Sequence, residues 1–168
     1  MIRRIVVVGM LVAGLLSAQG KGRPKFEPFD FRSLMQQIWD GWGTLSPAAT
    51  AKFYSKDAQR TFFDLTPLKY TGWSEYEAGV RKVFADYSSG KFTLSSDQHV
   101  AQRPTIAWAT ATGHGSLTKK SGGKDEMDFR WTVIWEKIEN QWLIVHEHVS
   151  APLAAPAPAK PPSAPTKK

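Results

Sequence analysis

The stretch that decides the fold is Phe129–Pro152, with the sequence FRWTVIWEKIENQWLIVHEHVSAP. Two runs of alternating aromatic, β-branched and polar residues flank the dipeptide Glu139–Asn140. Alternation with a period of two predicts β-strands, and a polar dipeptide between two such runs predicts a hairpin turn. The second run ends in His146, Glu147 and His148. Because successive strand residues face opposite sides, the two histidines are predicted to share one face of the sheet.

A two-residue turn at Glu139 and Asn140 predicts which hairpin residues pair, and paired residues lie on one face. The opposite face is expected to hold Arg130 and Glu147 as diagonal neighbours, in a structural or interface ion pair rather than at a ligand. Neither face is simply polar, so helices should cover one and a partner subunit the other. The first face is expected to combine tryptophans with the imidazoles: Trp131, Val133, Trp135, Trp142, Ile144, His146 and His148.

Both ends of the chain differ in composition from the middle. Residues 1–20 hold two arginines, an apolar run and small residues, which is the layout of a secretory signal peptide. Residues 153–168 are rich in Pro, Ala and Lys and are expected to be a disordered tail. Residues 21–28 are then a linker and residues 29–152 one domain. We expect an exported protein, periplasmic or secreted, whose only attachment to a membrane would be an uncleaved signal.

The net charge of the chain lies mostly in these ends. The whole chain carries +7, of which Arg3, Arg4 and three lysines of the tail account for five, so +2 remains for the rest. Such a small charge argues against a nucleic-acid partner, which needs a basic patch on the folded surface. The chain contains no cysteine, which excludes disulfides, thiolate nucleophiles and cysteine-ligated metals.

The order of the predicted elements indicates an α+β fold. Apolar residues at helical spacing predict a helix within Phe26–Trp42. Pro47 at a first turn predicts a short helix from Ser46 to about Tyr54, and a capping box of Ser74 and Glu77 predicts a third helix over Thr71–Tyr87. After the third helix the domain is predicted to be sheet, antiparallel or mixed, which is long and curved and encloses a cone-shaped cavity around about three helices. The predicted strands are Lys91–His99, Thr105–Thr118, Glu126–Ile138 and Gln141–Ser150.

A characteristic order of motifs runs along the domain. The motifs are Lys52-Phe53-Tyr54…Asp57-Ala58, Phe63-Asp64, Gly72-Trp73-x-x-Tyr76, Ala107-Trp108-Ala109-Thr110, Arg130-x-Thr132-x-x-Trp135-Glu136-Lys137 and Trp142-x-Ile144-x-His146-x-His148-x-Ser150. With these motifs the chain resembles the SnoaL-like branch of the nuclear transport factor 2-like superfamily, over about Phe29 to Pro152. It is also similar to the association domain of calcium/calmodulin-dependent protein kinase II, which ends in a similar Trp…His-x-His-x-Ser. The resemblance implies a cone with an internal pocket and a sheet surface that usually dimerises.

The resemblance does not supply a catalytic set. Ketosteroid isomerase-like members use an early tyrosine and a pair of acids, which have no matching positions in this sequence. Scytalone dehydratase-like members use paired histidines with Tyr and Asp, which His146 and His148 match in composition but not in spacing. The kinase hub has two pocket arginines, and the corresponding positions are Val133 and Thr110. Binding of a small carboxylate is therefore not inherited.

The chemistry of the side chains in the predicted pocket makes the two histidines the best catalytic candidates. His146 and His148 could move a proton, with Tyr54 or Asp64 across the cone. A zinc site with His114 as third ligand is the weaker alternative, so no metal and no cofactor are expected. The candidate ligand-binding residues are Tyr54, Asp64, Trp108, Thr110, Trp131, Val133, His146 and His148.

Three functions remain open from the sequence. The leading expectation is a homodimer that binds a small, mostly apolar molecule in the pocket of the cone, since tryptophans supply much of its lining. The first alternative is a cofactor-independent isomerase, dehydratase or hydrolase that uses His146 or His148 as acid and base. The second is an oligomerisation module in which the sheet face binds other subunits.

Overall fold

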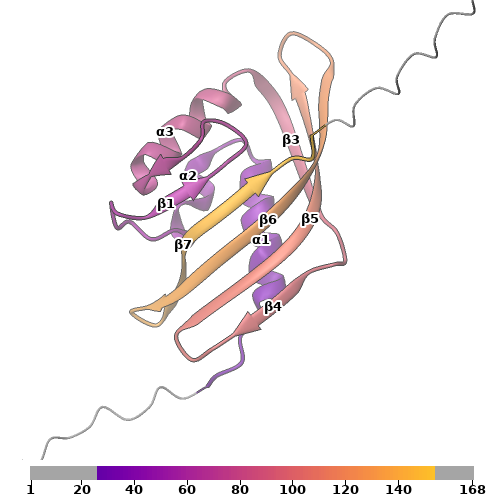
Figure 1. Cartoon of the computed structure of the whole chain (residues 1–168). Coiled ribbons are helices and arrows are strands. Elements are labelled where there is room, and N and C mark those ends of the chain that lie inside the picture. Colours follow the sequence, from indigo (N-terminus) through magenta and orange to yellow (C-terminus); the bar gives the residue numbers. More distant parts are fainter. Residues whose placement is uncertain (1–25, 154–168) are drawn as a thin grey trace, which may run out of the picture.

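The computed structural model describes residues 26–153 (Figure 1). The predicted signal peptide, most of the linker and nearly all of the predicted tail therefore lie outside the described residues. Helices come first, as the sequence predicts: α1 (Phe31–Gly43), α2 (Pro47–Thr50), a 3₁₀ turn η1 (Ala51–Phe53) and α3 (Gly72–Phe84). None of the described helices is long and apolar enough to cross a membrane.

Helix α1 forms because its cap and its apolar spacing agree. The Asp30 side chain accepts a hydrogen bond from the backbone N–H of Ser33 at 3.0 Å, which satisfies one of the free donors of the first turn. Apolar residues recur every three or four positions, so one face of the helix is buried against the sheet. Those residues are Phe31, Leu34, Met35, Ile38, Trp39 and Trp42.

The sheet is large, mixed, curved and not closed. Its strands run in the order β2-β1-β7-β6-β5-β3. Strand β4 also pairs with β5, along the part of β5 that precedes the part paired with β3. Strands β1 and β7 are parallel, and the other pairs are antiparallel. Helix α1 lies behind the long strands in Figure 1, so the helices cover one side of the sheet. The strands are β1 (Thr61–Phe63), β2 (Tyr70–Thr71), β3 (Tyr87–Leu94), β4 (His99–Gln102), β5 (Ile106–Lys119), β6 (Lys124–Ile138) and β7 (Gln141–Ser150).

The β6–β7 hairpin has the predicted turn. Glu139 and Asn140 both have positive φ, 48° and 64°, as the tight hairpin turns that match strand twist require. The first pairs also have the predicted register, with Lys137 opposite Trp142. Trp135 lies opposite Ile144, again as expected.

Beyond these pairs the register shifts by one residue, so the prediction for the end of β7 is wrong. Ile134, rather than Val133, lies opposite His146, and Val145 is the extra residue of a β-bulge. Because side chains alternate with a period of two, one extra residue exchanges the two faces for the remainder of the strand. Glu147 and Val149 therefore point into the cone and are buried, while His146 and His148 lie on the outer face.

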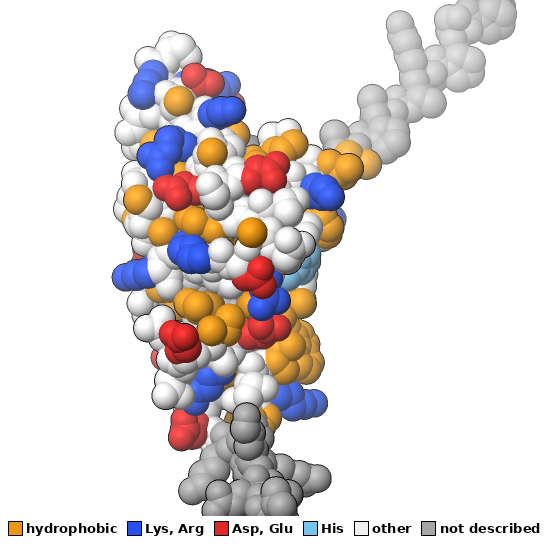
Figure 2. Space-filling view, turned by 90° about the vertical axis from the view of Figure 1, so that its left-hand side faces the viewer, with side chains coloured by type: hydrophobic (Ala, Val, Ile, Leu, Met, Phe, Trp, Pro, Cys, Tyr) orange, Lys and Arg blue, Asp and Glu red, His pale blue; other side chains and the backbone are white. Residues whose placement is uncertain are grey.

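The core fills the space between the helices and the inner face of the sheet. It is dominated by aromatic rings in tilted and edge-to-face contact, such as Trp39 with Phe129 at 4.4 Å between centroids. Figure 2 shows the side of the molecule that carries α3, β1 and β2, where basic, acidic and hydrophobic side chains are interspersed. The charge of this face is thus mixed.

Candidate functional site

A cavity of about 260 Å³ lies inside the cone, between helices α1 and α3 and the inner face of strands β3, β6 and β7. Leu65 and Thr66 from the β1–β2 loop and Val83 from α3 also line the cavity. Leu65 and Val83 are exposed hydrophobic residues, so the cavity opens to solvent between this loop and α3, and we call this opening its mouth. Its polar groups belong to Asp64, Tyr76, Tyr87, Asp125 and Glu147. Most of the wall is apolar: Trp39, Trp42, Val80, Phe84, Phe92, Leu117, Met127 and Val149.

Glu147 is the buried acid of this cavity, with 1% of its surface exposed. The Tyr54 hydroxyl donates a hydrogen bond to Glu147 Oε1 at 2.8 Å, and Trp131 Nε1 donates one to Oε2 at 2.9 Å. Trp42 Nε1 donates in turn to the Tyr54 hydroxyl at 3.2 Å. Two indoles and a phenol thus hold the carboxyl group in one orientation, and both of its oxygens have a neutral donor.

The environment of Glu147 raises the pKa of its carboxyl group. Burial raises the pKa of Glu147 to about 7, and the hydrogen bonds from Tyr76, Trp131 and Tyr54 offset part of this effect. The nearby Asp64 charge raises the pKa of Glu147 further. A carboxyl group with such a pKa is available both as a proton donor and as a proton acceptor near pH 7.

Asp64 is the second acid of the cavity and follows directly after β1. Burial raises the pKa of Asp64 to about 6. The hydrogen bond at 2.7 Å that its carboxylate accepts from the backbone N–H of Leu65 lowers the pKa and offsets part of this effect. Burial, with Asp64 and Glu147 nearby, also raises the pKa of Tyr76 well above its usual value, so Tyr76 keeps its proton. The site therefore combines two acids of shifted pKa with phenolic hydrogen-bond donors, which suits proton transfer.

The structure brings only part of the predicted site together. Asp64 lines the cavity, while Tyr54 and Trp131, each 1% exposed, bind its Glu147. Val133 is fully buried on the same inner face of β6. Trp108, whose side chain is 37% exposed, belongs to the predicted lining but lies on the outer face of β5.

Thr110 and the two predicted catalytic histidines also lie outside the cone. Thr110 is exposed on β5, on the same face as Trp108. The ring of His146 packs on Phe63, with 5.3 Å between centroids, and its Nδ1 hydrogen-bonds the carbonyl of Thr61 at 2.7 Å. His148 is exposed and packs on the same Phe63 ring at 5.6 Å. The prediction that the two imidazoles line the cavity is wrong because the bulge at Val145 turns them outward.

The predicted ion pair of Arg130 and Glu147 is also absent from the described residues. Arg130 is exposed and lies opposite Ser150 in the β6–β7 ladder, whereas Glu147 is bound by Tyr54 and Trp131 inside the cone. Glu147 is thus the candidate site residue that the sequence pattern placed on the wrong face. One signal could have revealed it: Trp142–Val145 are four consecutive apolar residues, so the period of two is lost before His146.

His114, the predicted third ligand of a zinc site, has other partners. Its Nδ1 lies 2.8 Å from an Asp128 oxygen and its Nε2 lies 2.7 Å from a Glu126 oxygen, on the exposed face of β5 and β6. Within residues 26–153 no three His, Asp or Glu side chains are grouped to hold a metal ion.

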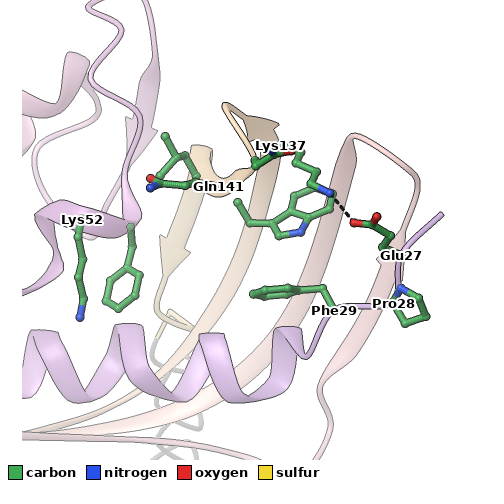
Figure 3. Close-up of a pocket in the computed structure, with 10 residues that line it drawn as sticks. Glu27, Pro28, Phe29, Lys52, Lys137 and Gln141 are labelled. Atoms are coloured by element: carbon green, nitrogen blue, oxygen red, sulfur yellow. Dashed lines mark hydrogen bonds and ion pairs between the residues drawn. The ribbon is translucent and has the colours of Figure 1, made fainter. Parts of the chain in front are cut away.

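A second hollow, larger and more open, lies at the turn end of the β6–β7 hairpin. Figure 3 shows Phe29 and Pro28 on one side of it and Lys52 on the other. Its volume is about 560 Å³, and Lys137 Nζ pairs with Glu27 at 3.0 Å at its edge. In this groove Lys52 is exposed and Lys137 is already paired with the largely exposed Glu27, whereas the interior cavity holds an acid removed from water. The interior cavity is therefore the better candidate site.

Comparison with known proteins places this architecture in a family. The family model described as "SnoaL-like domain" matches residues 32–154. A comparison with curated proteins returned no match. A solved nuclear transport factor 2-like superfamily protein from Salmonella enterica serovar Typhimurium superposes with a TM-score of 0.68 at 17% identity, covering 77% of this chain and 94% of its own.

Two further structures show the range of proteins that share the fold. One is a protein from Streptomyces avermitilis, named as a candidate dehydratase of the NTF2-like family, with a TM-score of 0.64 at 14% identity and coverage of 74% and 95% of the two chains. The other is the association domain of C. elegans calcium/calmodulin-dependent protein kinase II, with a TM-score of 0.57 at 17% identity and coverage of 73% and 93%. Such low identities establish the fold and leave the activity open. With the family model spanning the whole described domain, the chain belongs to the SnoaL-like domain family and has the nuclear transport factor 2-like fold.

Proposed function

We propose that the interior cavity binds a small, mostly apolar molecule and that Glu147 exchanges a proton with it. The observation that carries this proposal is the position of Glu147, which is buried beside the cavity and fixed by Tyr54 and Trp131. An unpaired acid in an apolar core lowers stability, so such a group is more often kept for function than for folding. Its pKa of about 7 suits general acid–base work.

The reaction class that fits is a cofactor-independent isomerisation, dehydration or hydrolysis. In these reactions a proton leaves one atom and returns to another, which one carboxyl group can do if it is close to the substrate. Asp64 lies near enough for its charge to raise the pKa of Glu147. Ionisation of Asp64 therefore makes Glu147 a stronger base.

Blocking the mouth of the cavity tests the binding function. Val83 is 41% exposed on α3 and contributes to the mouth, so Val83→Trp should close it without disturbing the core. Lys82→Trp places the same side chain one residue earlier on α3, outside this cavity, and is the matched control. We expect small neutral aromatics, screened by calorimetry, to bind the wild type and Lys82→Trp and to bind Val83→Trp at least about tenfold more weakly. Equal binding to all three proteins would refute the proposed site.

Acid–base activity is tested separately from binding. Cyclic ketones with acidic α-hydrogens, incubated in D₂O, report proton abstraction by the incorporation of deuterium. We expect the wild type to accelerate incorporation and Glu147→Gln to lose about a hundredfold or more of that acceleration. Binding without acceleration by the wild type would restrict the protein to a binding function.

A second proposal is that the outer face of the sheet forms a homodimer. Ile106 and Trp108 expose 38% and 37% of their surfaces on this face of β5, and Phe63 lies with the two histidines on β1 and β7. A sheet face with exposed aromatic and aliphatic groups is typical of an interface. The kinase association domain, which has the same fold, supports assembly as a use of this architecture.

We also propose that the protein is exported. The support is the arrangement of residues 1–20, with Arg3 and Arg4 before an apolar run and small residues. Sequencing the amino terminus of the protein recovered from its native host would show a start near residue 19 or 21. A mature protein that begins at residue 1 or 2 would contradict cleavage.

A further inference from the structure

The charges around the interior cavity have one sign. Among the described residues that line it are three acids, Asp64, Asp125 and Glu147, and no lysine, arginine or histidine. Asp125 has a basic partner of its own, because Lys119 Nζ lies 2.7 Å from its Oδ1 and the Tyr87 hydroxyl donates to its Oδ2 at 2.7 Å. Asp64 and Glu147 have only neutral donors in the described part of the chain. The site therefore lacks a positive charge that balances these two acids.

The carboxyl group of Glu147 can accept a further hydrogen bond. A carboxylate has about four acceptor positions. The bonds from Tyr54 and Trp131 use one on each oxygen, and the hydrogen bond from Tyr76 uses a third. The remaining position is buried, where an additional donor forms a stronger bond than in water. Because the group lines the cavity, a ligand is the source from which such a donor can come.

The rest of the cavity selects further among ligands. An anionic ligand would meet two carboxyl groups and no cation, which is unfavourable in an apolar pocket. A cation would be balanced by the acids and attracted to the ring faces of Trp42 and Tyr76 in the wall. The volume of about 260 Å³ holds roughly nine water-sized groups at about 30 Å³ each, so the molecule is small.

We propose that the ligand of this cavity is a small apolar amine, bound as an ammonium ion whose N–H groups donate to Glu147 and Asp64 while its hydrocarbon part fills the apolar wall. This inference rests on the proposed function, because it names the class of molecule that the same cavity takes. The bound ammonium ion would supply the positive charge that balances the two acids. It also gives the cavity a preference between molecules of the same size and shape.

Three probes of similar size separate this inference from the proposed function: benzylamine, benzyl alcohol and benzoate, titrated by calorimetry at pH 7.5. We expect benzylamine to bind the wild type at least about tenfold more tightly than benzyl alcohol, since hydrogen bonds to charged groups contribute about 1.5–3 kcal/mol. Benzoate should not bind. In Glu147→Gln and in Asp64→Asn the preference for the amine should fall to about twofold or less. Glu139→Gln, the same change in the exposed hairpin turn, should keep the full preference.

The outcomes that overturn the inference differ from those that overturn the proposed function. If benzyl alcohol binds as tightly as benzylamine, or if both acid variants keep the tenfold preference, the amine inference is wrong while the apolar pocket stands. If no probe binds the folded wild type, both proposals fail. Should one acid variant not fold, the other still decides the result, because each removes one of the two acceptors.

Discussion

At the scale of single residues, the site depends on the burial of one carboxyl group. The pKa of Glu147 is raised from its usual 4.5 to about 7, so the folded protein binds this proton more tightly than the unfolded chain does. The stability from this group is therefore fully present below about pH 4.5 and is lost as the pH rises to about 7. The raised pKa of Asp64 acts in the same direction between its usual 3.8 and about 6.

Glu147→Gln should remove this pH dependence, because glutamine has the same shape and does not ionise. Relative to the wild type, the variant should gain on the order of 3 kcal/mol of unfolding free energy between pH 4.5 and pH 8, which is the energy equivalent of a shift from 4.5 to about 7. Urea unfolding at the two pH values measures the difference. Glu139→Gln, exposed in the turn, should follow the wild type. A Glu147→Gln curve parallel to the wild type would show that the carboxyl group is not buried as described.

At the scale of elements, helix α1 depends on its first turn. Asp30→Ala removes the acceptor of the Ser33 N–H bond and should cost about 1 kcal/mol of unfolding free energy. Asp30→Asn keeps an acceptor in the same place and should cost much less. Urea unfolding of both variants measures the effect, and equal losses would show that the charge of Asp30, rather than its cap, stabilises the helix.

The elements themselves were largely predictable, and one local irregularity decided the site. Apolar spacing predicted α1 and a capping box predicted α3. Alternation, although broken over Trp142–Val145 in β7, predicted the long strands β5, β6 and β7, because a buried face imposes its period on the sequence. The dipeptide Glu139–Asn140 predicted the turn, since positive φ favours such residues. The bulge at Val145 was missed because it depends on packing inside the cone, where Glu147 meets Tyr54 and Trp131 from two other elements. Tyr54 binds Glu147 and Asp64 lies near it, whereas the sequence pattern placed Glu147 on the opposite face of the strand.

At the scale of the whole molecule, the proposed homodimer uses the outer face of the sheet. If the homodimer forms there, Trp108→Lys should convert it to a monomer, because a buried unpaired ammonium disrupts an interface. Leu68→Lys alters a side chain that is 91% exposed in the β1–β2 loop and should leave the dimer intact. Sedimentation velocity of the three proteins measures the mass. A wild type that sediments as a monomer, or a Trp108→Lys variant that stays dimeric, would contradict this interface.

The overall architecture followed from the sequence more securely than the function did. The nuclear transport factor 2-like cone is recognisable from motifs spread over the whole domain, because its long strands and three helices constrain many positions at once. The function depends on a few groups in one cavity, whose orientation changes with a single extra residue in β7. For this fold, therefore, family membership establishes the architecture and its cavity, whereas the orientation of individual side chains in the cavity determines the chemistry.

The most direct test of the account is the titration of the Glu147 carboxyl group itself. Carbon-13 NMR of protein labelled at the glutamate side-chain carboxyls follows each group through the pH range, and the resonance lost in Glu147→Gln identifies Glu147. This resonance should titrate at about pH 7, well above the usual 4.5 of a glutamate carboxyl group. Titration of this resonance near its usual value of 4.5 would contradict a buried acid at the cavity, and the proposed acid–base role with it.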